Sequence, residues 1–342
     1  MTTINKIAQL AGVSPATVSK VLNNRPYVSA EKRALIERII SETGYVPSQR
    51  ARGLSTKQSS ILGLLIPYTP DQLFTDPHLL ECMRGIENEA NSHGYKMLLS
   101  TVHAPVDAAN TCADLLRSDV IDGAIVLETL DLRVFANSFG ERHSPLIVIG
   151  YPQDHSIPTV HADDYGGALK ATRYMLELGH RRIGIVSSLP RPFALEERLR
   201  GIIDAHIACD VVQDEQLFAM GDMSVESGEE AGRLLLSRSA PPTAIFALND
   251  RMAIGVMRAA QAQGLHIPAD LSIMGFDDIP LAGLLTPALS TVRQPGRAMG
   301  TAAAQALFAM LADQTPEPIN VINTDIVIRG STAGPSQKGG TR

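Results

Sequence analysis

The chain from Ile61 onward alternates short apolar segments with longer amphipathic ones, and this alternation constrains the fold more than any other feature. The apolar segments lack the polar interruptions of a half-exposed strand, which is typical of parallel strands buried on both faces. The strands predicted in this way span residues 61–66, 96–100, 123–127, 146–149, 183–186, 244–247 and 271–275. Helices are predicted between them at about 79–92, 108–117, 132–141, 166–178, 195–207, 225–237 and 251–263.

These segments form two successive sets, so the sequence predicts two doubly wound α/β halves. A last helix at about 298–312 and a final strand at 325–328 would return to complete the halves. Ligands of such sheets bind beyond the carboxyl ends of the strands. Two halves side by side would therefore form a cleft for a small molecule.

The first 46 residues have a different pattern, that of a three-helix helix-turn-helix domain. Gly12 supplies the tight turn after a first helix, and Ser14 and Pro15 are suited to begin a second one. A serine hydroxyl can accept a bond from a free backbone N–H, and proline lacks an N–H where none is needed. Ser29 and Gly44 are predicted to cap the two ends of the third helix.

The second helix has an apolar side and a side of small polar groups. Val18, Val21 and Leu22 can pack on the first helix. The outward residues are small or hydrogen-bonding, as a helix that enters the major groove requires. The predicted DNA face consists of Ser14, Pro15, Ala16, Thr17, Ser19, Lys20 and Asn23. An ordinary amphipathic helix pair has the same spacing and is the alternative interpretation.

Charge is segregated along the chain. Nine basic and three acidic residues precede residue 59, a net charge of +6, whereas the whole chain carries −6, so the remainder carries −12. A basic end attracts DNA phosphates and an acidic body is repelled by them. This distribution favours DNA contact through the N-terminal domain alone.

Several motifs resemble those of the LacI/GalR family of bacterial transcription regulators. The first is Ile7-Ala8 followed by Ala11-Gly12-Val13-Ser14-Pro15-Ala16-Thr17-Val18-Ser19-Lys20-Val21-Leu22-Asn23. The others are Val28-Ser29, Gly44-Tyr45-Val46-Pro47, Arg50-Ala51-Arg52-Gly53-Leu54, Arg198-Leu199-Arg200-Gly201, Asn249-Asp250-Arg251-Met252-Ala253-Ile254-Gly255 and Gly275-Phe276-Asp277-Asp278. Many members have Arg or His in place of Lys20, so the base preference there is not carried over.

The resemblance implies a periplasmic-binding-protein-like (type I) effector domain and a hinge helix that forms when two subunits meet in the minor groove. Leu54 matches the leucine that wedges between base steps, and Ala51 matches the small residue beside it. Met223 stands where sugar- and purine-binding relatives often place an aromatic residue, so stacking on a ligand is in doubt. The effector contacts that the motifs carry over are Arg198, Asn249 and Asp277.

Positions just after strands supply further cleft candidates. Phe74 and Asp76 lie on a predicted loop after the first strand, and Asp163 follows a later strand. Carboxylate and amide acceptors with an apolar wall suit a neutral polyhydroxyl ligand. Two further residues have alternatives, because Asp250 could cap the helix that follows it and Asp278 could be structural.

Several other classes are disfavoured. No opening segment resembles a signal peptide, and no apolar run is long enough to span a bilayer, so a cytoplasmic protein is expected. Cys82, Cys112 and Cys209 are few and widely spaced and the histidines lack metal-ligand spacing, so neither a metal nor a cofactor is expected. No Gly-x-Gly-x-x-Gly or Gly-x-Ser-x-Gly motif supports an enzyme. A solute-binding protein would need an export signal and no helix-turn-helix.

The sequence thus predicts an α+β multi-domain chain. Its parts are a helix-turn-helix DNA-binding domain (1–46), a hinge helix or linker (47–59), an effector-binding and dimerisation domain (60–331) and a disordered tail (332–342). The predicted function is a homodimeric repressor that binds double-stranded operator DNA and releases it on binding a small carbohydrate. A dimer is expected because one recognition helix reads too few bases. Control by a purine or by a protein corepressor is the alternative.

Overall fold

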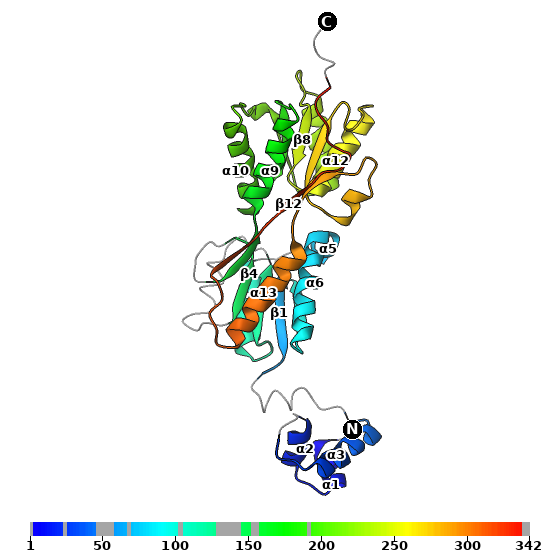
Figure 1. Cartoon of the computed structure of the whole chain (residues 1–342), viewed down its shortest axis with the longest axis vertical. Coiled ribbons are helices and arrows are strands. Elements are labelled where there is room, and N and C mark those ends of the chain that lie inside the picture. The colour runs from blue at the N-terminus through cyan, green and yellow to red at the C-terminus, as the bar shows by residue number, and fades with distance from the viewer. Residues whose placement is uncertain are drawn as a thin grey trace. The chain divides into compact units, whose positions relative to one another are not determined.

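The computed structural model describes residues 3–22, 26–45, 58–66, 70–101, 105–127, 145–151, 157–189 and 193–336. The chain divides into two compact units, residues 1–60 and residues 61–342 (Figure 1). The predicted contacts Asn23, Ala51 and Leu54 and the helix predicted at about 132–141 lie outside the described residues.

Unit 1 is a three-helix domain with a small apolar core. Its helices are α1 (Ile4–Ala11), α2 (Pro15–Leu22) and α3 (Ala30–Thr43). Gly12 and Gly44 end α1 and α3 in the left-handed region, with φ of 63° and 59°. The core is made by residues spaced three and four apart on each helix, namely Ile7, Ala8, Ala11, Val18, Val21, Ile36 and Ile39. Leu35 of α3 is exposed and does not belong to this core.

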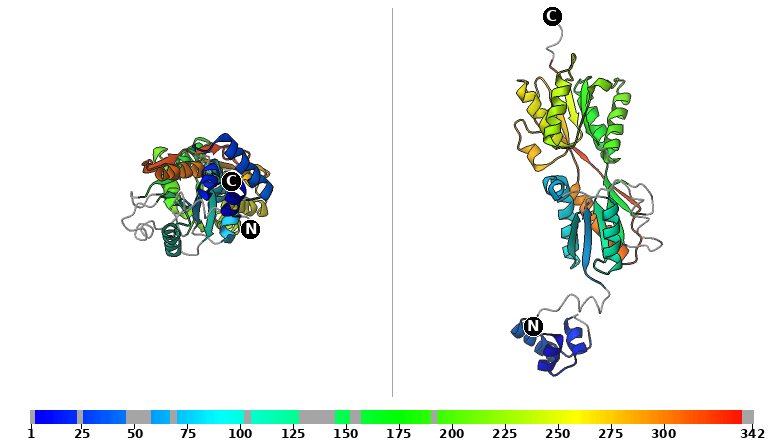
Figure 2. Two further views of the ribbon diagram at one scale, coloured as in Figure 1. Left: turned by 90° about the horizontal axis from the view of Figure 1, so that it is seen from below. Right: turned by 180° about the vertical axis from the view of Figure 1, so that it is seen from behind.

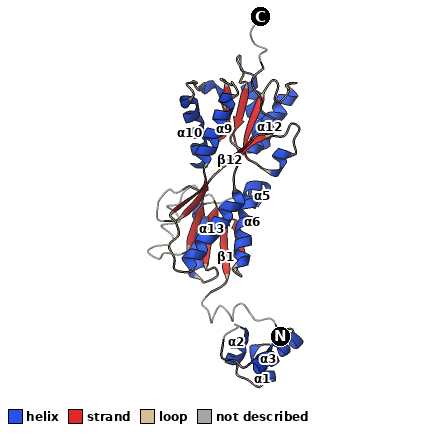
Figure 3. Ribbon diagram, viewed as in Figure 1, coloured by secondary structure: helices blue, strands red, loops and turns tan. Residues whose placement is uncertain are grey.

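Unit 2 contains two parallel sheets, each covered by helices on both faces (Figure 3). The first sheet has the order β11-β5-β4-β3-β1-β2. Its strands are β1 (Ile61–Ile66), β2 (Lys96–Thr101), β3 (Gly123–Leu127), β4 (Leu146–Ile149), β5 (Thr159–Ala162) and β11 (Ile319–Ile322). Its helices are α5 (Pro70–Thr75), α6 (Pro77–Ser92), α7 (Pro105–Arg117) and α13 (Gly296–Leu311).

The second sheet has the order β12-β10-β9-β8-β6-β7, and only β12 pairs antiparallel. Its strands are β6 (Ile183–Ser188), β7 (Phe218–Gly221), β8 (Ala244–Ala247), β9 (Ser272–Asp277), β10 (Ser290–Arg293) and β12 (Asp325–Val327). Its helices are α9 (Asp164–Glu177), α10 (Phe193–Ala208), α11 (Val225–Leu236) and α12 (Asp250–Ala262), with short 3-10 helices at Glu215–Leu217 and Pro280–Gly283.

The chain passes between the two halves three times. The crossings join β5 to α9, β10 to α13 and β11 to β12, and the last is the red segment in Figures 1 and 2. Each half therefore contains segments that are far apart in the sequence. The predicted return of the last helix and the final strand is confirmed, since α13 packs on the first sheet and β12 joins the second.

Three sequence expectations differ from the structure. Residues 70–75 form helix α5 instead of a loop. Strands β5, β7, β10 and β11 were not predicted, because all four are short and all but β7 contain polar residues. The segment expected to be disordered from residue 332 is ordered at its start. Thr332 bonds Ser290, and Ala333 bonds both Ser272 and His180.

Candidate functional site

The outward side of α2 presents the side chains predicted to contact DNA. Pro15, Ala16 and Lys20 are exposed, while Thr17 and Ser19 are half-buried. The Ser14 hydroxyl accepts a bond from the Thr17 backbone N–H at 3.2 Å and lies 3.0 Å from the Thr17 hydroxyl. These contacts fix the first turn of α2, so that its small residues lie on a rigid, exposed surface.

The opposite side of α2 is anchored to the rest of the domain. Val18 and Val21 are buried, and the Arg33 guanidinium of α3 donates to the Val21 carbonyl at the end of α2. A cation at a helix C-terminus satisfies a free carbonyl and interacts favourably with the helix dipole. The geometry of a reading helix held by two supporting helices is that of a helix-turn-helix.

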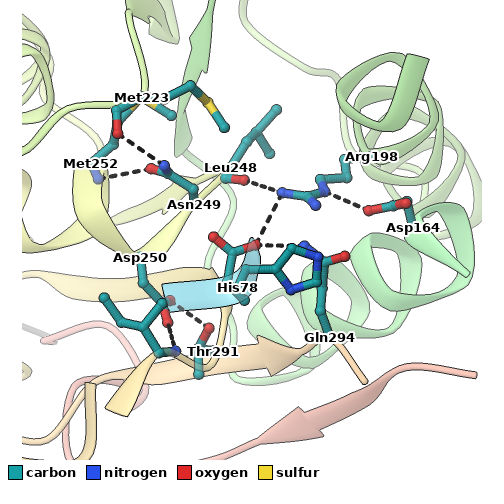
Figure 4. A network of polar contacts seen from close by, with 12 residues as sticks. His78, Asp164, Arg198, Met223, Leu248, Asn249, Asp250, Met252, Thr291 and Gln294 are labelled. Carbon is teal, nitrogen blue, oxygen red and sulfur yellow. Dashed lines mark hydrogen bonds and ion pairs between the residues drawn. The ribbon is translucent and has the colours of Figure 1, made fainter. Parts of the chain in front are cut away.

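A buried polar network in unit 2 centres on Arg198 of α10 (Figure 4). Its Nε donates to Asp164 Oδ1 at 2.7 Å, and both side chains are 4% exposed. Its Nη1 donates to the Leu248 carbonyl at 2.5 Å and lies 3.6 Å from Asp277 Oδ1. The guanidinium also lies 3.7 Å from the centre of the Phe276 ring. The ends of β8 and β9 and the start of α9 therefore meet at one arginine.

Asp277 ends β9 in an unusual backbone conformation. The φ angles of Asp277 and Asp278 are 117° and 59°, where residues with a side chain are rarely found. Three contacts hold this turn: Asp278 pairs with Arg293 at 2.7 Å and with Arg329 at 2.6 Å, and the Ile279 N–H donates to Asp250 at 2.9 Å. Strain of this kind is retained where the surroundings impose it, often at functional sites.

The carboxylate of Asp277 faces both halves of unit 2. Gln294, on the crossing to α13, donates to Asp277 Oδ1 at 2.6 Å. Burial raises the pKa of Asp277 well above its usual value, and the charges of Asp250 and Asp76 raise it further, whereas Arg198 and Gln294 lower it. Asp277 lines a cavity of about 180 Å³, and His78, in the first turn of α6 in the other half, lines the same cavity. The cavity therefore joins the two halves at a point where acceptors and donors converge.

The structure places the other predicted cleft residues as follows. Asp76 caps α6 by accepting from the His78 and Leu79 N–H groups, and Asp163 caps α9 by accepting from the Gly166 N–H at 2.8 Å. Phe74 lies on α5 and is exposed, so it is not packed as a wall. Met223 is half-buried against the core of the second half.

Asn249, and not Asp250, caps α12. Asn249 accepts from the Met252 N–H at 2.8 Å and donates to the Met223 carbonyl at 3.1 Å. The alternative that Asp250 is the cap is therefore wrong. Asp250 is fully buried and accepts from Thr291 at 2.6 Å. Asp278 has the structural partners described above, as its structural interpretation predicted, and His180 bonds Thr243 and Ala333.

Sequence reasoning missed Asp164, Tyr151 and Gln294. Asp164 is adjacent to the predicted Asp163, and the sequence does not show which of the two side chains reaches Arg198. In the folded chain it is Asp164. Tyr151 follows β4 and donates to Asp164 Oδ2 at 3.0 Å. Gln294 belongs to no motif quoted above. The signal that could have found it is its position directly after a strand, where cleft residues are expected.

No helix in the described part of the chain is long and apolar enough to cross a membrane. The same residues hold no group of three or more His, Cys, Asp or Glu side chains placed to bind a metal ion.

Comparisons with known proteins agree with this two-unit organisation. A family model described as bacterial regulatory proteins, lacI family, matches residues 3–48, and one for a periplasmic binding protein-like domain matches residues 172–332. The HTH-type transcriptional repressor CytR of Escherichia coli (strain K12) is 34% identical over 333 residues, covering 96% of each chain. The HTH-type transcriptional regulator CelR of Thermobifida fusca is 30% identical, covering 96% of this chain and 98% of the relative.

Solved structures share the same architecture. A complex of the transcriptional regulator CelR with cellobiose has a TM-score of 0.74 and 28% identity, covering 97% of this chain and 100% of that one. A LacI family regulator from Enterococcus faecium with bound ribose has a TM-score of 0.70 and 25% identity, covering 80% and 99%. The Lac repressor dimer bound to operator and the anti-inducer ONPF shares the fold, with a TM-score of 0.87 at 24% identity over 97% and 99%. The chain therefore belongs to the lacI family of bacterial regulatory proteins and is a sequence-specific DNA-binding transcriptional regulator.

Proposed function

We propose that this chain is a homodimeric repressor that leaves its operator when a small neutral carbohydrate binds between the halves of unit 2. The observation that carries the proposal is the position of Asp277. It joins the buried Arg198 network to a cavity lined by both halves, next to two chain crossings. The proposed role includes no catalysis and belongs to the cytoplasm, where operator DNA lies.

The carbohydrate class follows from the chemistry of the cleft. Asp277 of the second half lines the cavity, and the charge of Asp76, which caps α6 in the first half, raises the pKa of Asp277. We infer that the two carboxylates supply oxygen acceptors from opposite halves. Sugar hydroxyls donate to such acceptors without adding a negative charge, whereas an anionic ligand would be repelled by them. The relatives solved with cellobiose and with ribose support the same class.

The proposed dimer surface lies on α6 and on β2, the edge strand of the first sheet. A hollow of about 530 Å³ there is lined by apolar side chains, among them Leu80, Met83, Met97 and Pro280, and by the charged residues Glu81, Arg84 and Glu87. Leu284, which follows a 3-10 helix of the second half, is 79% exposed. A second copy would cover these apolar groups and the unpaired edge of the sheet.

Release of DNA is proposed to follow from movement of one half against the other. A ligand that contacts both halves favours one arrangement of them over another. An isolated helix as short as the segment 47–59 allows is only marginally stable in water. We infer that a small change in the spacing of two such segments is enough to melt a hinge helix on DNA.

A thermal-shift screen tests the ligand class. The full chain is heated with cellobiose, ribose, glucose or galactose, and with adenine, hypoxanthine or cytidine. A cleft ligand raises the melting temperature with the logarithm of its concentration. We expect a neutral sugar to raise the melting temperature and Asp277→Ala to abolish this shift. Asp114→Ala, at an exposed position on α7, should leave the shift unchanged.

The same screen decides against the proposal if only the nucleobases or the nucleoside stabilise the protein. A nucleobase is the second candidate, because Phe74 is exposed on α5, two residues before the Asp76 cap of α6, and would offer an aromatic face to a flat ring if α5 moved. A shift with adenine that Phe74→Ala removes would favour that candidate. A protein corepressor would leave every small molecule in the screen without effect.

A further inference from the structure

Tyr151 contacts the first crossing between the halves, and it belongs to none of the sequence motifs quoted above. It follows β4, and the residue before it, Gly150, has a φ of 149° and donates its N–H to the Val160 carbonyl of β5 at 2.9 Å. Its ring stacks on His161 with centroids 4.1 Å apart. Its hydroxyl lies 3.0 Å from the Ala162 carbonyl and 3.0 Å from Asp164 Oδ2. Tyr151 thus joins the first half to the first residue of α9.

The contact continues through the buried network to the second crossing. Asp164 accepts from Arg198, Arg198 lies beside Asp277, and Asp277 accepts from Gln294. Gln294 lies in the segment that joins β10 to α13. Each link is a hydrogen bond or an ion pair between buried or half-buried groups, which are costly to separate.

The third crossing is bonded directly to the first. The Thr324 hydroxyl donates to the Asp163 carbonyl at 2.9 Å, and the Asp163 N–H donates to the Ile322 carbonyl at 2.9 Å. The polar contacts therefore connect all three crossings, and Arg198 is the link between the first and the second.

We propose that Tyr151 is a positioning residue that couples the crossings through Asp164 and Arg198, so that the hinge segments move together. The proposal rests on the proposed function, because coupled crossings are the means by which a ligand at Asp277 would change the arrangement of the halves. The phenol is suited to this role. Burial and the charge of Asp164 raise the pKa of Tyr151, so the hydroxyl keeps its proton and remains a donor.

Hydrogen–deuterium exchange of the full chain without any ligand tests the coupling. Two backbone amides report on it: Asp163 N–H at the first crossing, and Gln294 N–H, which donates to the Asp277 carbonyl at 3.3 Å. Tyr151→Phe keeps the ring and removes only the hydroxyl. We expect exchange at both amides to become about tenfold faster, as loss of one hydrogen bond to a charged group predicts.

Tyr165→Phe is the matched control. Tyr165 also donates to a carboxylate, Asp204, at 2.9 Å, but that pair lies outside the network. This variant should leave both amides unchanged. In an Arg198→Met background, Tyr151→Phe should still affect Asp163 and no longer affect Gln294.

Coupling is reciprocal, which gives a second and independent variant. Gln294→Leu should speed exchange at Asp163 although the two residues do not touch. The proposal is overturned if Tyr151→Phe changes Asp163 alone, if Gln294→Leu changes Gln294 alone, or if Tyr165→Phe acts like Tyr151→Phe. Because no ligand is used, these outcomes do not depend on whether the effector is a carbohydrate.

Discussion

The coupling free energy between Arg198 and Asp164 should be far larger than that of an exposed ion pair with a similar N–O distance. Its atoms are 2.7 Å apart and each side chain is 4% exposed. Arg117 and Asp114 on α7 are 2.6 Å apart, but are 64% and 73% exposed. The N–O distances of the two pairs are similar, but Arg198 is buried and has further partners, so the pair on α7 serves as the exposed reference.

The magnitude follows from what each substitution leaves behind. Arg198→Met leaves Asp164 and Asp277 without their cation and removes the donor to the Leu248 carbonyl. Breaking a buried pair in this way costs about 3–5 kcal/mol of the free energy of unfolding. Asp164→Asn leaves the buried guanidinium with less compensation and should cost about as much. The double variant removes both charges of the pair and leaves Asp277 as Arg198→Met alone leaves it, so it should cost little more than that single variant.

Urea unfolding of the full chain, followed by circular dichroism at one protein concentration, measures the cycle. Circular dichroism is chosen because the chain has no tryptophan. We expect a coupling free energy of about 3 kcal/mol for Arg198 and Asp164, and below about 1 kcal/mol for Arg117 and Asp114. Additive losses at the buried pair, or equal coupling at both pairs, would refute the reasoning.

Three further substitutions have defined outcomes. If Lys20 reads a guanine, Lys20→Ala should weaken the binding free energy by about 1–3 kcal/mol on the cognate operator and by little on random DNA in anisotropy titrations. Equal losses on both DNAs would assign Lys20 to the phosphates. Burial raises the pKa of Asp250 from 3.8 to about 7. The stability that the protonated Asp250 carboxyl contributes is therefore present at acid pH and is lost as the pH rises through 7. Asp250→Asn should flatten that fall, and parallel curves of the free energy of unfolding against pH for the two proteins would contradict it. Gly255→Ala would place a Cβ 2.0 Å from the Val225 carbonyl oxygen, so the melting temperature should fall with a loss of about 1–3 kcal/mol or more, and an unchanged value would disprove the close packing of α11 and α12.

Most of the fold could be predicted because the buried strands are apolar without interruption. Strands β1, β3, β4 and β8 begin and end where the sequence pattern predicts. The missed strand β10 shows the limit of that signal. Its Ser290 and Thr291 are fully buried, yet they are polar and satisfied by hydrogen bonds that only the folded chain supplies.

The candidate site could be predicted in part. Arg198 and Asp277 were identified from motifs, and the structure brings them within 3.6 Å. Tyr151 could not be predicted, because its contact with Asp164 depends on how β4, β5 and α9 meet in space. Asp163 was selected in place of Asp164 for the same reason. A residue's place after a strand indicates the edge of a sheet, but it does not reveal which of two neighbours faces the cleft.

The central claim is that occupancy of the cleft weakens operator binding. Its most direct test is the operator affinity of the full chain, measured by fluorescence anisotropy on a duplex selected from random sequences, with and without the sugar that stabilises the protein. We expect the operator affinity to be at least about tenfold weaker with saturating sugar, within the usual range of allosteric coupling. A sugar that raises the melting temperature but leaves the operator affinity unchanged, or strengthens it, would show that cleft occupancy does not release the operator.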